Sequence, residues 1–354
     1  MVWMIDDDLT FEEVSSEDGV LVVRNVAAAR IAAARALCRT DIDILVSGFT
    51  GDPPVRPEAV LASQLIDLRA ALRFAVQQDP SAAWTPASPY VRVRDDYYDH
   101  AESADWHRPV TPVPWLPRQG LGWTVGDQLR SLLEEACSIP RGCTPFRPLL
   151  PCGESEPVRV RRADRGGNTI FRGLGPLLAH PYPAFPIGDR FSRRSDMVGL
   201  NVLLRRGGVV TAKGNFTLRH DRTLQPPVTD DIEPWLAEFG GVLLSRATAP
   251  ESTDAVTPEW LAAIAHHRAD RISRSLDNAE RAREACQEEL QDHRAWWQHL
   301  PTFRASCEAL AGELRHVAGV LANLRRSGLD DALRSEDLRR RVWVAFTELR
   351  GTWA

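Results

Sequence analysis

The stretch SDMVGLNVLLRRGGVVTAKGNFTLRHDRTLQP, residues 195–226, decides the fold that we expect. Apolar residues predominate in 197–206, a Gly-Gly pair follows, and 209–219 is again rich in β-branched and apolar residues. Two such runs joined by glycines are typical of a β-hairpin. This hairpin would place Asp196 at the start of one strand and Lys213 within the next, so that the two side chains meet near one end.

Lys213 is the only lysine among 43 basic residues, and all the others are arginine. Codon bias in a GC-rich genome explains most of this excess without any physical cause. A position that needs a compact ammonium group would nevertheless resist replacement, because arginine is a planar fork with different chemistry. Lys213 is therefore a candidate functional residue.

An aspartate and a lysine on paired strands suit the cleavage of a phosphodiester. The carboxylate can hold Mg²⁺, and the cation can stabilise the charge that develops on the phosphate. This arrangement resembles the PD-(D/E)XK nuclease superfamily, with Thr211-Ala212-Lys213 at the acid-x-lysine position. A small residue such as Thr211 at the acid position resembles the subgroup of type II restriction endonucleases that read sites with a CCGG core. The resemblance implies catalytic roles for Asp196, Lys213 and Thr211.

The segment that follows the lysine strengthens this resemblance. Residues 216–222, FTLRHDR, are similar to the aromatic-Thr-Ile-Arg-Ser-Asp-Arg signature of the subgroup, although two extra residues precede them. The resemblance implies that Arg219, Asp221 and Arg222 bind DNA, because arginine can bind guanine edges and a carboxylate can accept from cytosine. The alternative is that these residues form a surface salt-bridge cluster.

The resemblance also implies a Mg²⁺ site made by Asp196, Asp230 and Glu134. Asp164 is an alternative to Asp196, and Glu135 is an alternative to Glu134. If these acids do not converge, the protein would bind DNA without cutting it.

Hydrophobic patterns elsewhere predict an α/β (α+β) nuclease-like core with a mixed sheet and an all-α C-terminal helical hairpin or bundle. We expect an N-terminal α/β region with a Pro-rich loop (1–120), a nuclease core (121–250) and a helical, coiled-coil-like domain (258–354). Expected strands cover 19–23, 43–49, 157–163 and 240–246, and expected helices cover 27–37, 57–76 and 124–137.

The last hundred residues show a heptad-like spacing of apolar residues. Leu310, Leu314, Val317, Leu321 and Leu324 recur every three or four positions. We expect these helices to serve packing, homodimer formation or docking of a partner protein.

Charge is distributed unevenly along the chain, whose formal net charge is -5. Residues 1–155 carry a net charge of -8 and residues 156–225 carry +8. The basic segment is either a phosphate-binding surface or a region that docks on the acidic N-terminal part.

Two catalytic motifs are absent from the sequence. It has no Gly-Lys-Ser/Thr phosphate loop, which disfavours a P-loop NTPase, and no Gly-x-Ser-x-Gly nucleophile elbow. The motif DDYYDH, residues 95–100, resembles the metal motif of terpene synthases, but its setting favours an acidic loop or a clamp for the basic segment. No apolar run approaches the roughly 20 residues that span a bilayer. Six cysteines in a long chain and an acidic N-terminus without a signal-peptide pattern favour a cytoplasmic location.

The sequence thus leads to two functional hypotheses. The first is a Mg²⁺-dependent endodeoxyribonuclease that cleaves double-stranded DNA. The second is a non-enzymatic nucleic-acid-binding or scaffold protein that uses its helical C-terminal region.

Overall fold

A computed structural model gives the fold of the chain. It describes residues 2–5, 9–17, 20–53, 56–83, 96–103, 123–150, 157–160, 169–179, 185–187, 190–223, 225–252 and 256–351.

The centre of the fold is a six-stranded sheet. Its strands are β1 (Val2–Ile5), β2 (Leu9–Thr10), β5 (Ile44–Gly51), β6 (Val158–Arg159), β7 (Thr169–Arg172) and β10 (Thr211–His220). The order is β1-β7-β5-β10-β2, and β6 pairs with β10. Strands β5 and β10 are parallel, whereas the other pairs are antiparallel, so the predicted mixed sheet is confirmed. Two small antiparallel sheets consist of β3 (Glu12–Glu17) with β4 (Val20–Asn25) and of β8 (Pro186–Ile187) with β9 (Arg190–Phe191).

Helices surround this sheet and continue beyond it. They are α1 (Ala27–Leu37), α2 (Pro57–Ala75), α3 (Asp96–Ala101), α4 (Val125–Ala136), α5 (Leu174–Ala179), α6 (Ser195–Arg206), α7 (Glu233–Thr248), α8 (Pro258–Gln291), α9 (Pro301–Arg326), α10 (Leu329–Leu333) and α11 (Glu336–Gly351). Short 3₁₀ turns lie at Ile139–Arg141, Pro250–Ser252 and Trp296–His299.

The predicted hairpin is wrong, because residues 197–206 belong to α6 and not to a strand. A short apolar run fits a buried helix as well as a buried strand, so periodicity alone cannot separate the two. Gly207 ends the helix with φ 72° and Gly208 follows with φ 75°. Positive φ is available to glycine at helix ends as well as in hairpin turns, so the glycine pair does not identify the turn type.

The strand predicted at 240–246 is also wrong, because these residues lie inside α7. The glycine at this point is required by packing. A Cβ atom added at Gly241 would lie 2.1 Å from the backbone oxygen of Arg193. Of the strand predicted at 157–163, the described part contains β6.

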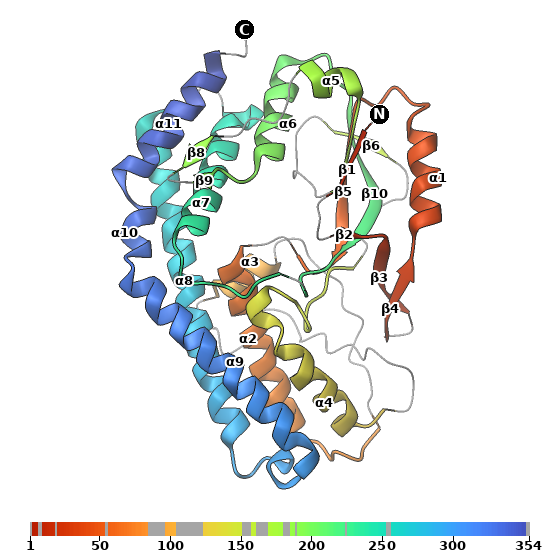
Figure 1. Cartoon of the computed structure of the whole chain (residues 1–354), viewed down its shortest axis with the longest axis vertical. Helices are drawn as coiled ribbons and strands as arrows, with labels where there is room; N and C mark the ends of the chain where they lie inside the picture. Colours follow the sequence, from red (N-terminus) through yellow and green to blue (C-terminus); the bar gives the residue numbers. More distant parts are fainter. Residues whose placement is uncertain are drawn as a thin grey trace.

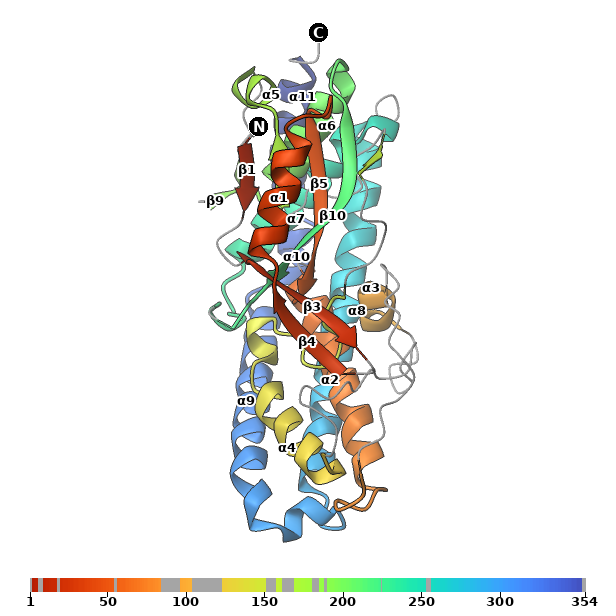
Figure 2. The same cartoon turned by 90° about the vertical axis from the view of Figure 1, so that its right-hand side faces the viewer.

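The two faces of the main sheet are covered by different helices. On one face, Leu37 of α1 packs in a cluster with Leu45 and Phe216, and Figure 2 shows α1 lying over β5 and β10. On the other face, Leu200 and Leu203 of α6 pack against the sheet. The sheet is therefore buried between α1 and α6.

The C-terminal helices share one hydrophobic core with helices from the rest of the chain. Helix α8 packs along α2, and α9 packs on α4, so that these helices form the lower half of the molecule in Figure 1. The apolar series from Leu310 to Leu324 is buried, as its spacing predicts. The three predicted segments thus meet in this core. No helix in the described part of the chain is long and apolar enough to cross a membrane.

Candidate functional site

Lys213 lies near the start of β10, and its side chain is exposed. It pairs in register with Val46 of β5, which packs in the cluster beneath α6. Side chains that pair in register point to the same face of a sheet, so Lys213 points to the face that α6 covers. The side chain of Thr211 points to this face as well but is buried.

The strand irregularity after Lys213 is held by Ser47. The hydroxyl of Ser47 donates to the backbone oxygen of Gly214 at 2.9 Å and accepts from the backbone N–H of Phe216 at 2.7 Å. The register of β10 against β5 shifts between Gly214 and Leu218. Such irregularities reorient side chains and are common beside functional sites.

Asp196 does not share a hairpin with Lys213. It lies in the first turn of α6, whereas the chain leaves the other end of that helix to reach β10. A helix of 12 residues is about 18 Å long. Burial raises the pKa of Asp196, and this effect outweighs the opposite effects of the Met197 N–H and of Arg194. The structure therefore places Asp196 among charged residues at the start of α6.

The other two predicted metal ligands are held by two distant points on α9. Asp230 accepts from Nδ2 of Asn323 at 2.5 Å, and Glu134 of α4 accepts from the hydroxyl of Ser306 at 3.5 Å. Ser306 and Asn323 are separated by about 25 Å along the helix axis. Glu135, the alternative to Glu134, instead accepts from Ser131 within α4.

The predicted carboxylates therefore do not form a Mg²⁺ site. Within the described ranges, no group of three or more His, Cys, Asp or Glu side chains is arranged to hold a metal ion. Asp164 lies outside the described residues. The described carboxylates Asp196, Asp230 and Glu134 therefore do not fit the Mg²⁺ site that the resemblance implies.

The predicted DNA-binding residues are brought together, but in ion pairs and a turn. Arg219 binds Glu12 at 2.9 Å and Asp221 at 3.1 Å. Asp221 also accepts from the N–H and hydroxyl of Thr223, and these bonds outweigh burial and lower its pKa. The backbone N–H of Arg222 donates to Asp52. This arrangement corresponds to the salt-bridge cluster that was the alternative.

Several arginines of the basic segment contact acids from other parts of the chain. The pairs are Arg159–Asp41, Arg190–Asp231, Arg194–Glu238 and Arg219–Glu12. Two of these acids come from the N-terminal part, as docking of the basic segment predicts, and two follow the segment. Part of its positive charge is therefore compensated within the chain.

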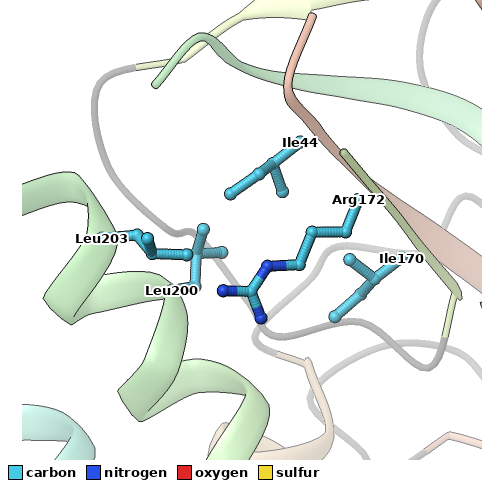
Figure 3. A pocket seen from close by; sticks show the side chains of 5 residues that line it. All are labelled: Ile44, Ile170, Arg172, Leu200 and Leu203. Atoms are coloured by element: carbon cyan, nitrogen blue, oxygen red, sulfur yellow. The ribbon is translucent and has the colours of Figure 1, made fainter. Parts of the chain in front are cut away.

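A small pocket between the sheet and α6 is mostly aliphatic (Figure 3). It is lined by Ile44, Ile170, Arg172, Leu200 and Leu203. The buried guanidinium of Arg172 extends into this lining and donates to the backbone oxygen of Pro176 at 3.0 Å. The lining contains neither an acid nor a nucleophile, so it has no evident chemistry.

Several arginines come together where α2, α3, α6, α7 and α8 meet. We call six residues there the arginine cluster: Arg56, Arg194, Arg246, Arg268, Arg271 and Arg274. Sequence reasoning missed it. The i, i+3, i+6 spacing of Arg268, Arg271 and Arg274 places them on one side of α8 and was the available signal.

Tyr98, from the DDYYDH motif, lies at the centre of the arginine cluster. The guanidinium carbon of Arg56 lies 5.1 Å from its ring centre and that of Arg271 lies 5.8 Å from it. Both distances allow cation–π attraction. Residues 96–100 of the motif therefore belong to a helix that contacts arginines, where we predicted an acidic loop or a clamp.

Carboxylates compensate only part of this charge. Glu102 contacts Arg56, Arg271 and Arg274, and Glu238 contacts Arg194. Burial would raise the pKa of Glu238, but Arg194 and Arg193 outweigh burial and lower it.

Arg194 adopts an unusual backbone conformation. Its φ of 65° is the only positive φ at a non-glycine residue in the described part of the chain. This conformation costs about 1–2 kcal/mol. The strained residue is thus both the N-cap of α6 and a member of the arginine cluster.

Arg268 is the least compensated member of the arginine cluster. Burial, together with the nearby charges of Arg56 and Arg246, lowers its pKa to about 10. In the described ranges no carboxylate forms an ion pair with it. A bound anion would relieve this repulsion.

A comparison of the chain with protein-family models, with curated proteins and with solved structures finds no match. The chemistry of the site therefore rests on its own geometry.

Proposed function

We propose that this protein binds nucleic acid through the phosphates, using the arginine cluster. The observation that carries the proposal is the convergence of six guanidinium groups, with Arg268 close to other cations. Four of these arginines lie on α7 and α8, and the other two directly precede α2 and α6. Arginine binds phosphate oxygens through two parallel N–H groups, and backbone phosphates receive most protein contacts in such complexes.

The arrangement suits a polymer of phosphates better than one isolated anion. Arg268, Arg271 and Arg274 extend over about 9 Å along α8. Arg246 of α7 is exposed, and the side chain of Arg274 is 52% exposed. Several phosphates can therefore reach different arginines at the same time.

The C-terminal helical region takes a direct part in this proposal. Three of the six arginines lie on α8, which is also the central packing helix. On another flank of α8, Asp270 and Asp277 bind Arg334 and Arg325. One flank of α8 is therefore cationic, whereas the acids on another flank are paired with arginines of the same chain.

The test is fluorescence anisotropy with labelled single- and double-stranded DNA and RNA at salt concentrations from about 50 mM to about 200 mM. We expect salt-dependent binding, and the double variant Arg268→Ala, Arg274→Ala should lower the salt slope by about two. The matched control is Arg281→Ala, an exposed arginine on α8 outside the cluster. Binding that is independent of salt, or an equal loss in the control, would overturn the proposal.

A Mg²⁺-dependent endodeoxyribonuclease is the second candidate. The observation that favours it is the exposed Lys213, which lies beside the irregularity of β10 and points to the face that α6 covers. Incubation with plasmid DNA and Mg²⁺ tests it, with Lys213→Ala as the variant. Absence of cleavage by the native protein, or equal cleavage by the variant, excludes this role for Lys213.

A further inference from the structure

Glu102 follows the last residue of α3 and lies among three arginines of the cluster. Its carboxylate is close to Nε of Arg271, to Nη2 of Arg56 at 3.3 Å and to Nη2 of Arg274 at 3.9 Å. The side chain of Glu102 is only 9% exposed. One carboxylate therefore faces three guanidinium groups in a largely buried position.

The arginines around Glu102 are held in place by other contacts. Nε of Arg56 lies 2.9 Å from the carboxylate of Glu58, which is itself buried. The ring of Tyr98 contacts both Arg56 and Arg271. These contacts do not involve Glu102, so the positions of Arg56 and Arg271 do not depend on Glu102 alone.

The backbone on both sides of Glu102 is anchored to α8. Nδ2 of Asn278 donates to the backbone oxygen of Ala101 at 2.8 Å and to that of Ser103 at 3.0 Å. A rotation of the Glu102 side chain can therefore vacate the space among the arginines without moving α3.

We propose that Arg56, Arg271 and Arg274 form an oxyanion subsite for one phosphate group, in which the carboxylate of Glu102 holds the place of the ligand. This inference rests on the proposed function and identifies one point of phosphate contact. A phosphate has more acceptor oxygens than a carboxylate and can receive paired N–H bonds from more than one arginine. Its binding displaces Glu102 towards solvent, and Glu102 competes with the ligand.

The competition predicts an unusual direction for a single substitution. Glu102→Gln should tighten binding of a labelled oligonucleotide about tenfold, because a charge-assisted contact with the arginines no longer has to be broken. Introduced alone, Arg274→Ala should weaken oligonucleotide binding. Combined with Glu102→Gln, it should reduce the gain in affinity that Glu102→Gln produces. The same pattern with inorganic phosphate as competitor would show that a free phosphate also fits the subsite.

Glu280→Gln is the matched control. This change also removes one negative charge, but Glu280 lies on α8 and binds Arg325 on the flank opposite the arginine cluster. If general electrostatics were responsible, both glutamine variants would tighten binding equally, and that result would overturn the inference. Thermal unfolding of each variant verifies that it is folded. The side chain of Arg274 is 52% exposed, so its replacement by alanine carries little risk of unfolding the protein.

The outcomes separate this inference from the proposed function. If the native protein binds oligonucleotides through Arg268 but Glu102→Gln leaves the affinity unchanged, the subsite is wrong and the proposed function stands. If neither the native protein nor the Glu102→Gln variant binds any oligonucleotide, both are wrong.

Discussion

The guanidinium of Arg147 binds the carboxylate of Asp67 through two nitrogens, and neither side chain is exposed to solvent. One of these contacts, from Nη2 to Oδ1, measures 2.8 Å. His100 adds its Nε2 at 3.1 Å from the same carboxylate. These contacts join α2, α3 and the segment after Arg141, so they position Tyr98 and Glu102, which lie on either side of His100.

Arg147→Met should destabilise the protein by about 3–5 kcal/mol, because it leaves the Asp67 carboxylate buried without its main partner. The free energy of unfolding in urea measures this loss. The double variant Asp67→Leu, Arg147→Met should recover part of it, because no buried charge remains. A loss below about 1 kcal/mol in the single variant would contradict the prediction.

The same pair predicts how stability depends on pH. Burial would raise the pKa of Asp67, but Arg147 and His100 outweigh burial and lower it. The unfolded state therefore takes up this proton at a higher pH than the folded state. The stabilisation is present above the unfolded pKa of about 3.9 and is lost as the pH falls through the folded pKa. The urea midpoint should fall more steeply with acid for the native protein than for Asp67→Asn, and equal slopes would contradict this assignment.

Gly241 and Gly312 offer a matched pair of substitutions by alanine. Gly241→Ala should cost about 1–3 kcal/mol, because its Cβ would lie 2.1 Å from the backbone oxygen of Arg193 and must displace the chain beside Arg194. Gly312→Ala should stabilise α9 by about 0.5–1 kcal/mol, because its nearest neighbour is a side-chain atom 3.8 Å away. Thermal unfolding measures both, and shifts of the same sign would contradict the packing argument.

The sequence predicted those elements whose signals are local. Thr124 begins α4 as expected, with its hydroxyl accepting from the Asp127 N–H and Asp127 accepting in return from the Thr124 N–H. The buried series on α9 follows from its spacing. Gly207 failed as a signal, because a glycine with positive φ can stand at a helix end as well as in a hairpin turn.

The candidate site could not be predicted in the same way, because its residues are distant in sequence. Arg56, Tyr98 and Arg271 meet only after α2, α3 and α8 have packed. Helix α8 contains seven acidic residues and five arginines, so its composition gave no indication that one flank is cationic. The position of Asp196 beside Lys213 was inferred from a hairpin, and that inference failed because residues 197–206 form a helix.

Ser47→Ala should destabilise the sheet by about 1–3 kcal/mol, because it removes the acceptor for the buried N–H of Phe216. The effect should be local to the irregularity of β10, so hydrogen exchange of the Phe216 amide should accelerate more than that of amides in α9. If the variant has native stability and unchanged exchange, the hydroxyl does not hold the irregularity.

Tyr98→Leu should weaken nucleic-acid binding several-fold, whereas Tyr98→Phe should retain most of the affinity. The reason is that Arg56 and Arg271 contact the face of the ring, and an aliphatic side chain lacks the negative π-face that attracts the guanidinium groups. Anisotropy titrations at one fixed salt concentration measure the effect, and thermal unfolding of both variants separates it from a loss of fold. Equal affinities for the two variants, at equal stability, would show that the ring face does not orient the arginines. An equal loss in both variants, relative to the native protein, would instead assign the contact to the hydroxyl.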